Sequence, residues 1–203
     1  MSVVGSDDSD DDGGAVEPPA TDGSDSTPPP TDTGSPPGPA DSFEDGLHVV
    51  GRDIEPGRYI AVGVAGDCDW TRFADVEATE PVAAAESIAG QAVVDIAAED
   101  AAFSSQNCGV WETYVPRTAP PATTFTDGDW VVGDQVEPGT YQSNVADSAR
   151  CTWTHARGFA HTAEEVIDSH AELYPGDAPP AVVELGEGDR FSSQLCQPWT
   201  KVE

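Results

Sequence analysis

The sequence has few basic residues. It contains 8 lysines and arginines against 38 aspartates and glutamates, and Lys201 is the only lysine. The formal charge of −30 repels the phosphates of nucleic acids and anionic lipids, so we predict no nucleic-acid partner. The charge would attract cations or a basic partner, but it is also expected of a solvated surface that only keeps the protein soluble. Because net charge alone argues for solubility, we adopt the second interpretation.

Long hydrophobic runs are also absent. No stretch approaches the roughly 18 consecutive apolar residues that a membrane-spanning helix needs, so we predict no transmembrane segment. The first residues, Met1–Gly5, lack the basic and apolar regions of a signal peptide. Methionine occurs once, whereas 18 prolines and 20 glycines are distributed along the chain. This composition favours many short strands and turns over helices.

Residues 1–42 contain almost no large apolar side chains. They are mainly Asp, Ser, Gly, Pro and Thr, and the only aliphatic residues larger than alanine are Val3, Val4 and Val16. Such a segment cannot bury enough apolar surface to offset its ordering entropy, so we predict a disordered acidic tail. A second proline-rich segment, residues 116–124, is predicted to be an extended linker. Tails of this kind often tether a folded module to a surface.

The remainder of the sequence is an internal repeat. Residues 43–115 align with residues 125–203, and VGRDIEPGRY at 50–59 recurs as VGDQVEPGTY at 132–141. A Cys-x-Trp motif and a Phe-Ser-Ser-Gln motif follow in the same order in both copies. Length changes fall between these motifs, as expected if loops absorb them. The duplication predicts two domains of the same fold.

Each copy is predicted to consist of short strands separated by turns. In the first copy we expect strands at residues 47–50, 58–64, 68–74, 82–89, 92–97, 101–106 and 109–115. The alanine-rich runs could instead be helical, because alanine is the best helix former, but the matching region of the second copy favours strand and loop. The predicted fold class is therefore all-β, with two tandem small β-sandwich or partly open barrel domains.

A Pro-Gly pair recurs at the same place in both copies, as Pro56-Gly57 and Pro138-Gly139. Proline presets φ near −65° and glycine accepts the positive φ that follows, so each pair predicts the middle of a type II turn. We expect this turn to close the first hairpin of each domain.

Each copy contains two cysteines: Cys68 and Cys108, then Cys151 and Cys196. Four cysteines allow three connectivities, and pairing within each copy lets each domain close on itself. A metal site is the alternative, but no Cys-x-x-Cys occurs and no histidine recurs in both copies. We predict two disulfides, each stabilising a small domain by about 4 kcal/mol in the chain-entropy treatment. Disulfides indicate an oxidising compartment, hence an extracytoplasmic location.

Tryptophan is the first candidate for a ligand surface, because exposed indole rings can stack on sugars. Four of the five tryptophans recur two or three residues from a cysteine, where an indole most often packs on the disulfide as core. Trp130 matches His48 of the first copy and lies outside the shared pattern. We therefore single out Trp130 as the candidate ligand-surface residue.

Histidine is the candidate for chemistry. His155, His161 and His170 all lie in the second copy, and a hydrolase or metal-dependent activity there would require them to converge in one cleft. Their spacing matches no metal-ligand signature, and the sequence contains no Gly-x-Ser-x-Gly elbow, phosphate loop or dinucleotide fingerprint. We predict no catalytic residues, metal site or cofactor, and keep this activity as the alternative.

The ordered combination of Asp-Gly, Val-Gly, acidic-Pro-Gly-x-Tyr, Cys-x-Trp and Phe…Cys…Trp resembles a repeat of secreted or lipoprotein-type proteins of actinobacteria. The resemblance covers both copies and implies an extracytoplasmic β module without a settled activity. We therefore expect a monomeric, non-enzymatic module, secreted or at the cell surface, on an acidic stalk. Its partner would be a protein or a cell-wall glycan; a pure spacer role is the other possibility.

Overall fold

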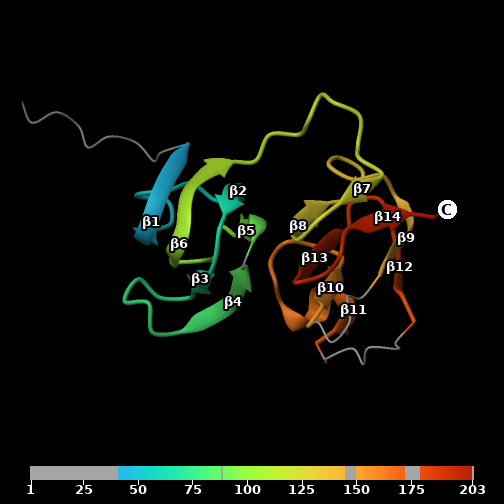
Figure 1. The fold of residues 1–203 in the computed structure, drawn as a ribbon. Helices are drawn as coiled ribbons and strands as arrows, with labels where there is room; N and C mark the ends of the chain where they lie inside the picture. Colours follow the sequence, from blue (N-terminus) through green and yellow to red (C-terminus); the bar gives the residue numbers. More distant parts are fainter. Residues whose placement is uncertain (1–40, 88, 145–149, 172–178, 203) are drawn as a thin grey trace, which may run out of the picture. The chain divides into compact units, whose positions relative to one another are not determined.

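The computed structural model describes residues 41–87, 89–144, 150–171 and 179–202, which all belong to one compact unit. The fold is all-β, as predicted, and the described ranges contain one short 3₁₀ helix besides the strands (Figure 1). No helix among these residues is long and apolar enough to cross a membrane. The tail predicted for residues 1–42 lies outside the described residues up to residue 40, and the first strand begins at Ser42.

The first repeat, residues 43–115, is a six-stranded sheet that curls into a nearly closed barrel. Its strands are β1 (Ser42–Val49), β2 (Gly57–Val64), β3 (Cys68–Phe73), β4 (Pro81–Ser87), β5 (Gly90–Ile96) and β6 (Ala102–Thr113). The long strand β6 organises the sheet, because its first half pairs with β3 and its second half pairs with β2, while β1 pairs with both halves. The resulting order is β4-β3-β6-β2-β5.

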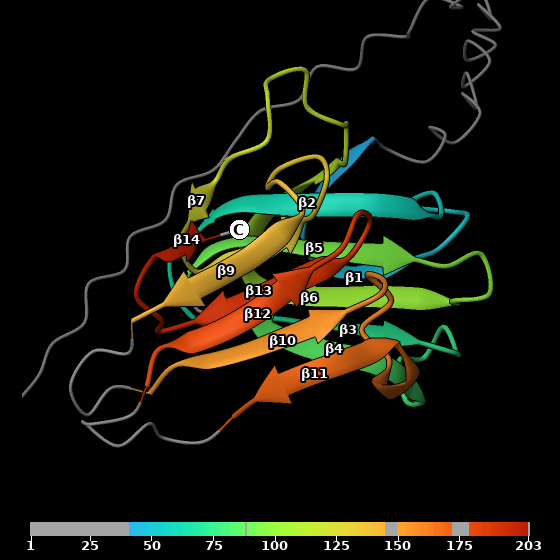
Figure 2. The same cartoon turned by 90° about the vertical axis from the view of Figure 1, so that its right-hand side faces the viewer.

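The second repeat, residues 125–203, has the same topology in more pieces (Figure 2). Its elements are β7 (Thr124–Phe125), β8 (Gly128–Val131), β9 (Gly139–Ser143), β10 (Thr152–Ala156), η1 (Ala163–Glu165), β11 (Val166–His170), β12 (Ala181–Leu185), β13 (Arg190–Gln194) and β14 (Trp199–Lys201). They form two sheets, β11-β10-β13-β8 and β12-β9-β14-β7, so β7 with β8 replaces β1, and β13 with β14 replaces β6.

One substitution explains why the second repeat is split. Pro198 occupies the position of Val110, which pairs with Glu44 directly before the register shift of the β1–β6 ladder in the first repeat. Proline has no backbone N–H to donate, so the ladder is interrupted there and both corner strands end. The sheet of the first repeat therefore divides into two sheets in the second.

Each repeat has its own hydrophobic core with the same aromatic arrangement. The rings of Phe43 and Trp111 stack at a centroid distance of 6.3 Å, and those of Phe125 and Trp199 stack at 6.4 Å. These pairs come from facing positions of the corner strands, since Phe43 pairs with Trp111 and Phe125 pairs with Trp199 in the ladders. The closing Trp and the opening Phe of the repeated motif are therefore core residues.

The structure corrects the type II turns predicted at Pro56-Gly57 and Pro138-Gly139. Both Pro-Gly pairs lead into a strand: β2 begins at Gly57, which does not have a positive φ, and β9 begins at Gly139, whose φ of 147° is far from the value of about 80° that a type II turn requires. The tight turn lies five to six residues earlier, where Gly51 has a φ of 79° and Gly133 has a φ of 92°. The Pro-Gly pattern correctly indicated a change of chain direction, but it put the turn at the wrong residues. The glycine of the preceding Val-Gly pair already has the positive φ that the tight turn needs.

The predicted first hairpin is also wrong, because β1 and β2 do not pair with each other and both pair with β6. The spacing shared by the two copies serves another contact: the hydroxyl of Tyr59 donates to the carbonyl of Glu55 at 2.8 Å, and that of Tyr141 donates to the carbonyl of Glu137 at 2.8 Å. The acidic-Pro-Gly-x-Tyr sequence is thus held by its own tyrosine.

Two other boundaries differ from the sequence-based expectation. The strands predicted at 101–106 and 109–115 are one strand, β6, with a bulge at Asn107, whose φ is 57°. The end of the predicted linker already belongs to the second repeat: the N–H of Ala122 donates to the carbonyl of Gln135 at 2.9 Å, and β7 begins at Thr124. The alanine-rich run at 82–88 is strand β4 up to Ser87, as predicted.

Candidate functional site

The two predicted disulfides are present and occupy equivalent places. Cys68 pairs with Cys108 and Cys151 pairs with Cys196, with Cα atoms 4.5 and 4.4 Å apart. Each bond joins the start of the Cys-x-Trp segment to the cysteine two residues after Phe-Ser-Ser-Gln, which lies within β6 at Cys108 and after the end of β13 at Cys196. The metal alternative for these cysteines is therefore wrong.

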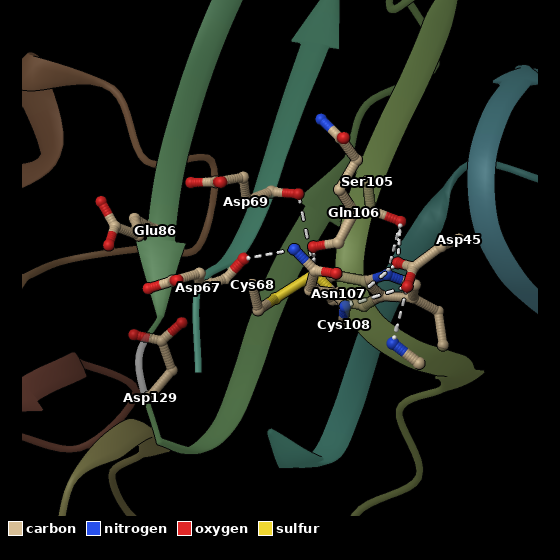
Figure 3. The surroundings of a disulfide bond; sticks show 12 residues. Asp45, Asp67, Cys68, Asp69, Glu86, Ser105, Gln106, Asn107, Cys108 and Asp129 are labelled. Atoms are coloured by element: carbon tan, nitrogen blue, oxygen red, sulfur yellow. Dashed lines mark hydrogen bonds between the residues drawn. A yellow bond between two sulfur atoms is a disulfide. The ribbon is translucent and has the colours of Figure 1, made fainter. Parts of the chain in front are cut away.

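An aspartate fixes the segment beside each disulfide, which is the bulge of β6 in the first repeat and the loop after β13 in the second. The carboxylate of Asp45 accepts the N–H groups of Cys108 and Gly109 at 3.0 Å and the hydroxyl of Ser105 at 2.8 Å (Figure 3). In the second repeat, Asp127 accepts the N–H of Leu195 at 2.8 Å and makes the corresponding contacts to Cys196 and Ser193. A carboxylate that accepts several backbone N–H groups holds a loop that lacks ladder partners. The Asp-Gly and Phe-Ser-Ser-Gln motifs are thus structural.

The recurrent tryptophans are core residues, as predicted: Trp70, Trp111, Trp153 and Trp199 are all buried. Trp130 is the exception and is only partly buried. Its ring lies 5.5 Å from that of Phe125, and its Nε1–H donates to the carbonyl of Thr126 at 2.8 Å. His48 makes the same two contacts in the first repeat, to Phe43 and Glu44. Trp130 thus adds indole surface at a position where the fold needs only a small ring.

The three histidines of the second repeat have three separate roles. The Nε2 of His155 lies 2.6 Å from the carboxylate of Asp189, and Arg72 makes the equivalent pair with Asp100 in the first repeat. His161 reaches the other repeat, and the ring of His170 stacks on a core tryptophan. Among the residues that the structure describes, no group of three His, Cys, Asp or Glu side chains could hold a metal ion. Nothing in this arrangement supports the hydrolase or metal-dependent alternative.

The feature that sequence reasoning missed is an interface between the repeats, formed along the outer edge of β5. The N–H of Val93 donates to Asp129 at 3.1 Å, and the carbonyl of Val93 accepts the Nε2–H of His161 at 2.8 Å. Two residues on, the N–H of Asp95 donates to the carbonyl of Phe159 at 2.8 Å. The second repeat therefore covers an edge strand whose backbone groups would otherwise lack protein partners.

The side chain of Phe159 anchors the interface. It is fully buried and contacts Val93 and Val131, which come from different repeats. The guanidinium carbon of Arg58 lies 3.8 Å from the centre of its ring, and the same guanidinium forms a two-pronged ion pair with Asp95. Burial of a phenylalanine side chain contributes roughly 2–3 kcal/mol, so this ring is a principal contact between the repeats.

Charged groups are buried beside this ring. The carboxylate of Asp129 accepts from Arg190 at 3.5 Å, and the guanidinium of Arg72 pairs with Asp100 at 2.6 Å and donates to the carbonyl of Ala160 at 2.7 Å. All four charged side chains are almost completely inaccessible. Burial, followed by the charge of Arg190, lowers the pKa of His161 to about 4, so this imidazole is neutral at pH 7.

Scarce cations were the signal that could have identified the interface. The chain has only 8 basic residues, yet Arg58, Arg72 and Arg190 all fall within strands and all form ion pairs next to the second-repeat loop or β8. Arg72 and Arg190 pair with carboxylates that are almost completely buried, whereas the Arg58–Asp95 pair stays about one-third exposed.

Two hollows flank the interface. The first, of about 440 Å³, lies between Val62, Tyr114, Val115 and Arg117 of the first repeat and linker and Trp130 of the second. The Tyr114 hydroxyl at its edge donates to Asp134, and burial followed by this hydrogen bond raises the pKa of Tyr114. The predicted ligand-surface residue is therefore in a concave site shared by both repeats.

The second hollow, of about 370 Å³, separates strand β4 of the first repeat from β10, η1 and β13 of the second. Its first wall is lined by residues 84–87. Its second wall carries hydroxyl, imidazole and guanidinium side chains, among them Thr154, His161, Arg190 and Ser192.

Comparison with known proteins identifies the repeat. The family model described as the Rv1352-like extracellular domain matches the chain twice, over residues 40–112 and residues 122–200. Each match covers one repeat, and together they cover more than half of the chain. No curated protein and no solved structure matches the chain.

Proposed function

The chain belongs to the Rv1352-like extracellular domain family, and from this premise we propose that it is a non-enzymatic binding module whose ligand contacts the cleft around Trp130. The family and the two disulfides place the protein outside the cytoplasm. We further propose, from the resemblance of its motifs, that its setting is an actinobacterial cell surface.

One observation supports this proposal most directly. Of five tryptophans, the four that recur are buried, and the one that does not recur faces a cleft formed by both repeats. The same cleft exposes Val115 by 74% and Val62 by 63% of their surfaces. Adjacent exposed apolar and aromatic side chains in a concavity mark binding sites more often than isolated ones do.

The surroundings of Trp130 restrict the ligand. The cleft contains one cation, Arg117, and one carboxylate, Glu112, and the surface beyond it is strongly acidic. A polyanion would be repelled, whereas an uncharged sugar ring or an apolar protein segment can stack on the indole. A secreted protein or a neutral cell-wall glycan is therefore the proposed partner.

The test is retention of cell-wall material, purified glycans and secreted proteins on the immobilised full chain. Trp130→His is the informative variant, because His48 shows that histidine satisfies the same ring contact and the same hydrogen bond. Val182→Ala, which alters a valine 57% exposed on β12, is the matched control. We expect wild type and the control to retain one of these materials and Trp130→His to lose it. Equal retention by all three proteins would remove Trp130 from the site, and no retention by any would leave a spacer role.

A further inference from the structure

The edge strand β4 has backbone groups that face a crevice. β4 ends the order β4-β3-β6-β2-β5 and pairs with β3 alone in the described part of the chain. The carbonyl of Glu86 accepts the side-chain Nε2–H of Gln194, from the second repeat, at 2.5 Å. That carbonyl therefore points away from β3.

Alternation along the strand then places Ala84 in the same orientation. In an antiparallel pair, successive residues direct their N–H and C=O groups to opposite sides, so Ala84 and Glu86 both face the free edge. Neither N–H group, and not the carbonyl of Ala84, forms a hydrogen bond to another described residue. Two backbone donors and one backbone acceptor of β4 are thus open to the crevice.

The crevice has the dimensions and walls of a strand-binding slot. Its volume is about 370 Å³, and residues 84–87 line one side over about 10 Å, at roughly 3.3 Å per residue. The side chains of Ala84 and Ala85 are too small to obstruct the edge. On the opposite side, the hydroxyls of Thr154, Thr162 and Ser192 can donate to or accept from the outer edge of an added strand.

We propose that this crevice binds an extended basic segment of a partner protein, which adds to β4 as an antiparallel or parallel strand. Main-chain hydrogen bonds to the N–H groups of Ala84 and Glu86 and to the carbonyl of Ala84 would supply the affinity, as in other cases of strand addition to a sheet edge. This site uses none of the residues proposed for the cleft around Trp130.

Charge selects the class of partner. Of the charged residues in the crevice, Asp129 is paired with Arg190, whereas Glu86 is exposed and forms no ion pair with a described residue. From residue 46 onward the chain has 26 acidic and 8 basic residues, so the field around the crevice is negative. The tail of the same chain is excluded as occupant by charge, because its first 45 residues contain twelve acidic residues and no base.

The test uses synthetic probes on the full chain. The first probe is a nine-residue peptide of alternating serine and valine with lysine at both ends; the second has glutamate at both ends. The third is the lysine probe with N-methyl groups on two central residues, which removes backbone donors and keeps the side chains. Binding is followed by amide chemical shifts and by hydrogen exchange at Ala84 and Glu86.

We expect the lysine probe to protect these two amides from hydrogen exchange. The glutamate probe lacks the favourable charge contact and the N-methylated probe lacks main-chain hydrogen bonds, so each should bind at least about tenfold more weakly. Ala84→Pro should weaken the lysine probe by a similar factor, since it removes an outward N–H. Ser169→Pro is the matched control, because Ser169 pairs with Thr154 as Ala84 pairs with Thr71.

Three results would overturn the proposal. They are equal binding of the N-methylated and unmodified probes, perturbation of amides away from β4, and no binding of any probe to the wild-type chain. The N-methylated probe tests the idea on the unmodified protein, so it stands even if Ala84→Pro fails to fold. Trp130→His should leave probe binding unchanged, which separates failure here from failure at the other cleft.

Discussion

The two repeats have the same core arrangement, but equivalent surfaces are covered in one repeat and exposed in the other. Val93 on β5 is completely covered by the second repeat, whereas Val182, at the equivalent position on β12, is 57% exposed. The difference extends to the docking loop, since the buried Phe159 of the second repeat corresponds to the exposed Val76 of the first. The two repeats therefore share one topology but make one directed contact, from the Phe159 loop of the second repeat to the β5 edge of the first.

This asymmetry has a consequence for assembly. A docking loop and a receiving face exist in both repeats, so the contact could in principle continue from molecule to molecule as a heterologous chain. The surfaces left over for such a contact are poorly suited to it. The receiving face of the second repeat carries Gln142 where the first repeat has Ile60, and the loop of the first repeat carries a valine where the second repeat has a phenylalanine. The expectation of a monomer stays a prediction that sedimentation can test.

The largest expected effect comes from removing a disulfide, and the two repeats should respond alike. The bonds close separations of 40 and 45 residues, for which the chain-entropy treatment gives about 4 kcal/mol each. We predict equal losses in the free energy of unfolding for Cys68→Ala/Cys108→Ala and Cys151→Ala/Cys196→Ala, measured by urea titration. A loss confined to one pair would show that the other repeat is stable through packing alone.

The next effect concerns acid, and it should originate in the interface. Because the pKa of His161 is lowered from its ordinary 6.5 to about 4, the unfolded chain binds a proton that the folded chain does not. The corresponding stability is complete above pH 6.5 and is lost as the pH falls toward 4, by up to about 3 kcal/mol. Arg190, Arg72 and Asp129 are the charged groups that act on this imidazole.

The measurement is the free energy of unfolding between pH 7 and pH 4 for wild type and His161→Asn. Asparagine tolerates the φ of 56° found at His161 and does not titrate. We expect the variant to lose part of the acid dependence, while Ala78→Asn, at the equivalent position of the first repeat, leaves it unchanged. Identical pH profiles for all three proteins would contradict a role for the buried imidazole.

Much of the fold was predictable because it is encoded locally and repeated. Alternating patterns and turns located the strands, and the disulfide pairing followed from one pair of cysteines in each copy. The pairing of β1 with β6 was not predictable, because it joins Phe43 to Trp111 across most of the repeat and no local pattern specifies such a partner. The alternation of apolar and polar residues indicates which face of a strand is buried, but it does not indicate which strand lies along its edge.

The candidate site was less accessible to sequence reasoning than the fold. Trp130 could be singled out because the repeat provides its own comparison, with His48 in its place. The cleft around it could not, since its walls come from both repeats and depend on how Phe159 docks. Comparison of the two copies identifies the residues that differ between the repeats. The three-dimensional structure is needed to identify which residues they contact.

A glycine pair separates the effect of the interface from that of the fold. Gly46 and Gly128 are equivalent and have φ values of 144° and 124°, so alanine is strained at both. A Cβ on Gly128 would lie 2.8 Å from the backbone nitrogen of Gln91 in the other repeat, whereas one on Gly46 would lie 3.7 Å from a histidine side chain. We predict that Gly128→Ala destabilises by about 1–3 kcal/mol more than Gly46→Ala in urea titrations. Equal losses would mean that the repeats separate at little cost.

The smallest expected effect is a gain in stability from exchanging one residue between the repeats. Leu195 and Asn107 are equivalent and have φ values of 59° and 57°, in the left-handed region that asparagine accepts and leucine does not. Leu195 is exposed, so its side chain contributes little burial to offset that strain. Leu195→Asn should therefore raise the free energy of unfolding by about 1 kcal/mol and the melting temperature by roughly 2–4 °C. Asn107→Leu should lower both by similar amounts, and a loss of stability in Leu195→Asn would mean that the leucine makes a contact worth more than its strain.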